Sequence, residues 1–90
     1  MTSRTAFNFG PLDAKTRTLV DLGIGVGMHV RWIVRKCIQR ALEQGISVAE
    51  LEQAIWCGAN FLEFQRVNDA LQWLREELQN ENEDGRGCGY

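Results

Sequence analysis

The chain is poor in the residues that most often carry chemistry. It contains one proline, one histidine (His29) and three cysteines, Cys37, Cys57 and Cys88. The cysteines are too widely spaced for a Cys-x-x-Cys pair, and His29 completes no familiar zinc-binding spacing with them. We therefore predict free thiols, no metal site and no cofactor.

The chain also lacks a long hydrophobic run. Its longest apolar stretch, residues 22–30, is interrupted by three glycines and His29. A transmembrane helix needs about 20 predominantly apolar residues, so this stretch is too short to span a bilayer. The N-terminus has no apolar signal-peptide core. We predict a cytoplasmic protein without a membrane partner.

Charge is unevenly distributed along the chain. Residues 28–42 carry four basic residues and no acidic one, whereas residues 43–90 carry ten acidic residues against three arginines, and the net charge is −2. Such segregation permits charge pairing within one chain or head to tail between copies. It argues against nucleic-acid binding, because the acidic half would repel a phosphate backbone.

No segment alternates like a strand, and the periodicity predicts an all-α fold of about four helices. Asp13 can cap a first helix. The glycines at 23, 25 and 27 then indicate either a frayed helix end or a close contact between helices. A second helix is predicted from Met28 to Gln44, where Gly45 stops it.

A capping box at Ser47–Glu50 predicts the start of a third helix, in which Cys57 is a small core residue. A fourth helix is predicted from about Asn60 to Leu78, because apolar residues recur there at spacings of three and four. The members of this stripe are Phe64, Val67, Leu71, Leu74 and Leu78.

The predicted organisation is an N-terminal arm at 1–11, a helical domain at 12–79 and a flexible acidic and glycine-rich tail at 80–90. Phe7 and Phe9 offer the arm two docking side chains. A domain this small buries a modest core, and oligomerisation is a common remedy at this size.

The predicted second helix has one apolar and one polar face. Six residues share the apolar face when successive residues are placed 100° apart: Val30, Ile33, Val34, Cys37, Ile38 and Ala41. Trp32 lies on the opposite face with Arg35 and Lys36. We predict an oligomer interface there, since aromatic and arginine side chains favour interfaces. Cation–π stacking within the chain and stacking on nucleic-acid bases are the alternatives.

Several segments together resemble the carboxymuconolactone decarboxylase family, which includes the alkylhydroperoxidase-D-like (AhpD-like) proteins. The resemblance rests on residues 12–17, residues 28–45, the stretch from Arg40 to Leu51 that includes Gly45-Ile46-Ser47, and residues 67–78. It implies a small helical domain that assembles as a ring or a dimer-based oligomer.

The motif that carries the chemistry of redox family members is absent. The resemblance places their Cys-x-x-Cys pair at Val30 and Ile33, their histidine at Cys37 and a helping glutamate at Thr18. Thiol chemistry needs a thiolate and a second cysteine to resolve the oxidised sulfur. Cys37 lies on the apolar face, where burial should raise its pKa.

Two main hypotheses of function follow. The first is a non-catalytic binding or assembly module, as a homo-oligomer or as a subunit that binds another protein. The second is an enzyme with decarboxylase-like or weak thiol peroxidase activity that uses Cys37 or His29. Nucleic-acid binding through Trp32 is a distant third.

Overall fold

The computed structural model describes the backbone of residues 10–85 and the side chains of residues 10–80. This part of the chain contains helices and no strand, which confirms the predicted all-α class. The elements are α2 (Ala14–Met28), α3 (Arg31–Glu43), α4 (Val48–Trp56), the short 3₁₀ helix η1 (Cys57–Asn60) and α5 (Phe64–Gly85). Phe7, Phe9 and Cys88 lie outside the described residues.

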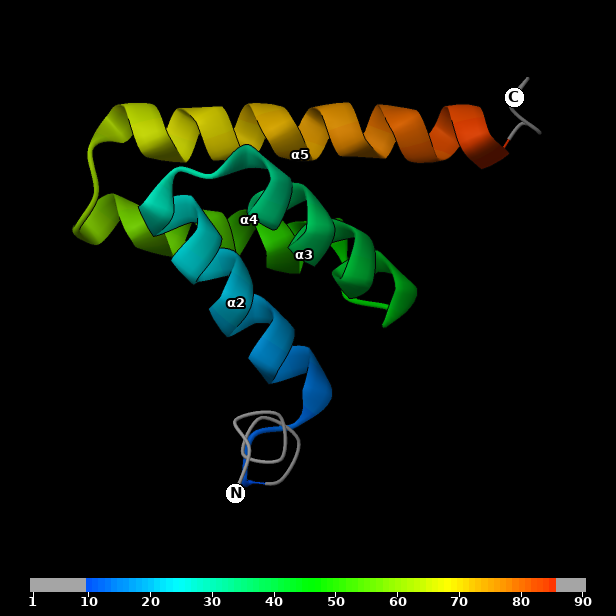
Figure 1. Ribbon diagram of the computed structural model, residues 1–90, viewed down its shortest axis with the longest axis horizontal. Coiled ribbons are helices and arrows are strands. Elements are labelled where there is room, and N and C mark those ends of the chain that lie inside the picture. Colours follow the sequence, from blue (N-terminus) through cyan, green and yellow to red (C-terminus); the bar gives the residue numbers. More distant parts are fainter. Residues whose placement is uncertain (1–9, 86–90) are drawn as a thin grey trace.

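The long helix α5 forms one side of the molecule, and α3 and α4 lie beside it (Figure 1). α2 runs obliquely away from α5 toward the N-terminus, so that only its C-terminal end lies near α5 (Figure 1). α2 packs most extensively on α3, and α3 also packs on α5. α3 therefore has one side against α2 and another against α5. The C-terminal part of α5 extends beyond the other helices (Figure 1).

A single apolar core joins the four α-helices. Its buried members are Leu22, Val26, Val34, Cys37, Ile38, Ala41, Ile46, Leu51, Ile55, Val67, Ala70, Leu71 and Leu74. Most of the apolar face predicted for the second helix lies in this core, although Val30 and Ile33 are only half-buried.

α2 begins where the sequence predicts. The side chain of Asp13 accepts a hydrogen bond from the Thr16 backbone amide at 2.8 Å, which caps the helix. The helix then runs through all three glycines without fraying. A Cβ on Gly25 would lie 2.8 Å from Cγ2 of Ile33, so glycine lets α2 approach α3 closely. Of the two alternatives for the glycine run, the close contact is confirmed.

The predicted second helix starts too early. Met28 is the last residue of α2, and His29 adopts a left-handed conformation with φ of 59°. The amides of His29 and Val30 donate to the carbonyls of Val26 and Gly25, closing the end of α2 as glycine usually does. α3 starts only at Arg31, with Val30 as its N-cap. Position 29 carries neither the glycine nor the asparagine that usually marks a left-handed helix end.

The end of α3 follows the prediction. Gly45 has φ of 83°, and its amide and that of Ile46 donate to the carbonyls of Leu42 and Ala41. The predicted capping box also forms: the Glu50 amide donates to Ser47 Oγ, and the Ser47 amide donates to the Glu50 carboxylate. These two signals fix the turn between α3 and α4.

The region after α4 differs from the prediction. Cys57 ends α4 and opens η1, where it is exposed rather than a core residue. η1 and a turn occupy residues 57–63, so α5 starts four residues later than expected. Phe64 is the first residue of α5 and is 64% exposed, because it precedes the turns that pack on the core. The inward stripe therefore begins at Val67.

α5 also continues beyond the predicted end of the domain at residue 79. Its backbone remains helical to Gly85. Once a helix is formed, each further residue adds one backbone hydrogen bond, and the sequence offers no breaker before this glycine. The backbone of residues 80–85, which the sequence pattern assigns to the tail, is therefore helical. None of the helices in the described part of the chain is long and apolar enough to cross a membrane.

Candidate functional site

A shallow, open groove lies between α2 and α3, next to positions that the sequence singles out. Its volume is about 230 Å³. Two lining residues, Asp21 and Ile24, come from α2, and the others, Trp32, Ile33, Lys36, Cys37 and Arg40, come from α3. The close approach of the two helices at Gly25 fixes the spacing of its walls.

Two of the three positions that carry redox chemistry in redox members of the family that the sequence resembles line this groove. Ile33 and Cys37 line it, and Val30 is half-buried at the start of α3. Thr18 is buried on α2, and its hydroxyl donates to the Ala14 carbonyl at 3.0 Å. The Thr18 hydroxyl is therefore hydrogen-bonded within its own helix.

Cys37 is the one thiol at the groove. Its side chain is 5% exposed, and it is a free cysteine, as is Cys57. Burial raises the pKa of the Cys37 thiol above its usual value, and the nearby Asp21 carboxylate raises it further, against a smaller opposing effect of Arg40. The thiol is thus held in its protonated, weakly nucleophilic form at neutral pH.

The residues predicted to form one interface divide between two sides of α3. Trp32 is 68% exposed and lines the groove together with Lys36. Arg35 turns instead toward α5, where its Nε donates to Glu77 Oε1 at 2.9 Å. The structure therefore brings Trp32 and Lys36 together and separates Arg35 from them. Within the described side chains Trp32 has no cation–π contact.

Glu77 anchors the α5 side of α3. This carboxylate is only 3% exposed, and Gln39 Nε2 donates to its second oxygen at 2.9 Å. Arg31 and Glu76 form a more exposed ion pair beside it, with a distance of 2.8 Å. The predicted charge pairing between the basic helix and the acidic half of the chain thus occurs within one chain.

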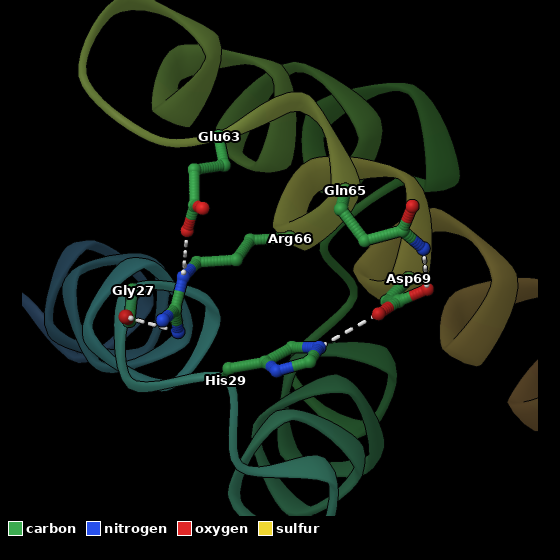
Figure 2. Close-up of polar contacts among 6 residues, drawn as sticks. All are labelled: Gly27, His29, Glu63, Gln65, Arg66 and Asp69. Carbon is green, nitrogen blue, oxygen red and sulfur yellow. Dashed lines mark hydrogen bonds and ion pairs between the residues drawn. The ribbon is translucent and has the colours of Figure 1, made fainter.

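His29 takes part in a second polar cluster, at the junction of α2 and α3. Its Nε2 lies 2.7 Å from Asp69 Oδ2, and Gln65 Nε2 donates to the other Asp69 oxygen at 2.9 Å (Figure 2). The imidazole also stacks on Trp73, with ring centroids 5.4 Å apart. The hydrogen bonds from His29 and Gln65 lower the pKa of Asp69 below its usual value.

Arg66, in the first turn of α5, forms hydrogen bonds at the same junction. Its Nη1 donates to the Gly27 carbonyl at 3.2 Å, and its Nε donates to Glu63 at 3.1 Å (Figure 2). These contacts connect His29, with its left-handed backbone conformation, and the end of α2 to α5. The hydrogen bonds of this polar cluster give it a structural role.

The two candidates for catalysis lie in different places. Cys37 lines the groove, whereas His29 is bound to Asp69 on α5 and does not line it. An Asp–His pair can serve as a general base only when it reaches a reacting group. No group of three or more metal-ligating side chains occurs among the described residues.

Sequence reasoning missed Asp69, Trp73 and Glu77. Glu77 had a detectable signal, because it falls three residues after Leu74 on the inward stripe of α5. A charged residue at such a position predicts a buried partner. Asp69 and Trp73 had no comparable signal, since their contact with His29 depends on the unexpected break after Met28.

The helices and the groove define a small all-α domain with an apolar hollow over the α2–α3 contact. The chain belongs to the carboxymuconolactone decarboxylase family, whose model matches residues 3–76. No curated protein and no solved structure matches the chain. The family assignment therefore rests on the family model together with the fold.

Proposed function

We propose that the chain is a non-catalytic binding and assembly module that forms a homo-oligomer through α2 and the groove side of α3. The observation that carries this proposal is the exposed apolar surface there. Val20, Ile24 and Met28 recur every four residues along the outer face of α2, and all three are exposed. Trp32 continues this surface on α3.

The opposite face of α2 is already buried in the core through Leu22 and Val26. α2 is thus apolar on both sides, and a helix of this kind normally has both sides covered. A contiguous exposed apolar patch marks an interaction site on a protein surface. We assign a second copy to this surface, because a single domain of 90 residues buries only a modest core and oligomerisation is a common remedy at this size.

Replacing Trp32 by alanine tests the assembly. The variant should lose the oligomer while its helical circular dichroism and melting temperature stay close to those of the parent, since Trp32 contributes little to the core. Val48→Ala is the control, because Val48 is an exposed apolar residue on α4 outside the groove. An unchanged oligomer in Trp32→Ala would contradict the proposal.

Thiol peroxidase activity is the second candidate, and it is favoured by the position of Cys37 on the groove wall. In that reaction the thiolate sulfur attacks a peroxide oxygen, the O–O bond breaks, and a sulfenic acid and an alcohol form. An external thiol would have to reduce the sulfenic acid, since Val30 and Ile33 supply no resolving cysteine.

Alkylation distinguishes the two candidates within one sample. For a non-catalytic module, Cys37 should react with iodoacetamide more slowly than the exposed Cys57 at pH 7, as read by mass spectrometry of peptides. Rapid alkylation of Cys37, together with loss of peroxide turnover in Cys37→Ser, would establish the enzyme instead.

A further inference from the structure

A second exposed apolar feature lies where η1 meets α5. Phe61 is 90% exposed and Phe64 is 64% exposed, three residues apart. We call these two residues the aromatic corner. Phenylalanine has no polar atom to hydrate, so two such rings on a surface are typical of a contact with another molecule.

Hydrogen bonds of its own turn define the backbone of the corner. The amides of Phe61 and Leu62 both donate to the Gly58 carbonyl, at 3.0 and 2.7 Å. Leu62 packs so closely on Gly58 that an added Cβ there would lie 2.9 Å from its Cδ1. Leu62 therefore anchors the turn while Phe61 stays exposed. Aromatic side chains are common anchors of protein interfaces.

The groove between α2 and α3 has the size of a side-chain pocket. Pockets that enclose small-molecule ligands have volumes of about 300–1,000 Å³. The groove, at about 230 Å³, is smaller. Ile24, Trp32 and Ile33 give it apolar walls, which suit an aromatic ring without hydrogen-bonding atoms.

The charges beside the two surfaces are complementary. Glu63 lies between the two phenylalanines of the corner, and its side chain is 78% exposed although Arg66 already binds it. Lys36 is exposed at the rim of the groove and makes no ion pair within the described side chains. The second cation of the rim, Arg40, is paired with Asp21 at 3.4 Å. Lys36 is thus the cation at the rim with which Glu63 of another copy can form an ion pair.

We propose that the aromatic corner of one copy docks in the α2–α3 groove of the next copy, so that the oligomer is built head to tail. This inference rests on the proposed function, because it names the partner surface of the same groove. A chain cannot fill its own groove in this way, since Phe61 is almost fully exposed. A head-to-tail contact leaves one corner and one groove unoccupied until a ring closes.

Mixing two variants tests this arrangement in the full-length chain. Phe61→Ala removes the corner, and Ile24→Glu places a charge in the groove. Each variant alone should be monomeric by light scattering. An equimolar mixture should form a 1:1 dimer, because the Phe61→Ala copy supplies an intact groove and the Ile24→Glu copy supplies an intact corner. The dissociation constants of the single variants should rise about thirtyfold or more.

Other assemblies give different results. If grooves pair with each other, Phe61→Ala stays oligomeric, which overturns the head-to-tail contact but leaves the proposed function intact. If corners pair with each other, Ile24→Glu stays oligomeric, which overturns both the contact and the assigned surface. A monomeric parent chain would overturn both proposals.

A charge exchange gives a second readout that does not depend on removing a hydrophobic residue. Lys36→Glu and Glu63→Lys should each weaken the oligomer, and the double variant should recover most of the parent affinity. Additive weakening in the double variant would contradict the predicted contact between these two side chains.

Discussion

The side chains on the two sides of α3 differ in how far they are covered and paired within one chain. On the α5 side, Arg35 and Gln39 each donate a hydrogen bond to one oxygen of the buried Glu77 carboxylate. On the α2 side, Trp32 and Lys36 border an apolar groove and remain exposed. The same helix thus carries a buried ion pair on one side and an exposed groove on the other. Both sides of α3 contribute to the fold, since α3 packs on α2 and on α5, but only the α2 side also leaves an exposed groove, through which we propose that copies assemble.

The largest expected effect of a single substitution is on the α5 side. Arg35→Ala leaves the Glu77 carboxylate buried without its cation, which should lower the free energy of unfolding by about 3 kcal/mol. Arg31→Ala is the control, because the Arg31–Glu76 pair is more exposed and should contribute less than about 1 kcal/mol. Urea denaturation measures both changes. Equal effects would contradict a special role for Glu77.

Replacing the pair with apolar side chains sharpens this result. In Arg35→Met with Glu77→Leu, no buried charge is left alone, and much of the lost stability should return. Continued instability of the double variant would show that the ion pair itself, and not an uncompensated charge, determines the stability of the α3–α5 contact.

On the α2 side, glycine substitutions should have effects of opposite sign. Gly25→Ala places a Cβ 2.8 Å from Ile33, so it should lower the free energy of unfolding by about 1–3 kcal/mol. Gly23→Ala meets nothing within 4 Å and should raise it by up to about 1 kcal/mol through helix propensity. Measuring both in an Ile24→Glu background removes the contribution of assembly. Equal effects would contradict the close approach of α2 and α3.

A smaller effect concerns pH and the His29 junction. The folded-state pKa of Asp69 is lowered, so the folded state binds fewer protons than the unfolded chain around pH 4. The stability that Asp69 contributes is therefore present above its unfolded pKa and is lost as pH falls through its lower folded pKa. Asp69→Asn should flatten this part of the acid unfolding curve.

Asp13 and Glu50 serve as reference groups for that curve. Their pKa values are also lowered, by the capping hydrogen bonds with Thr16 and Ser47. Their contributions should persist in Asp69→Asn, so the variant should keep a residual acid dependence. An acid limb that is identical in the parent and in Asp69→Asn would contradict the contact between His29 and Asp69.

Much of the fold could be predicted from local sequence. The caps at Asp13 and Ser47 and the stop at Gly45 depend on hydrogen bonds between neighbouring residues, and all three are confirmed. The break at His29 could not be predicted, because a left-handed histidine depends on contacts with Asp69 and Trp73 that are 40 or more residues away.

The candidate site was predictable only in part. The periodicity placed Cys37 in the core and Trp32 on the exposed side of the helix, and both placements are confirmed. It could not separate Arg35 from Lys36, because the polar face contacts α5 on one side and solvent on the other. The exposure of Phe61 and Phe64 depends on the η1 turn, which periodicity did not reveal.

The measurement that tests the central claim most directly is the mass of the parent chain in solution. Light scattering over a range of concentrations should give a multiple of 10.2 kDa, and Ile24→Glu should reduce it to 10.2 kDa while the helices stay folded. A parent mass of 10.2 kDa at every concentration would contradict the claim that the groove side of α3 is covered by another copy.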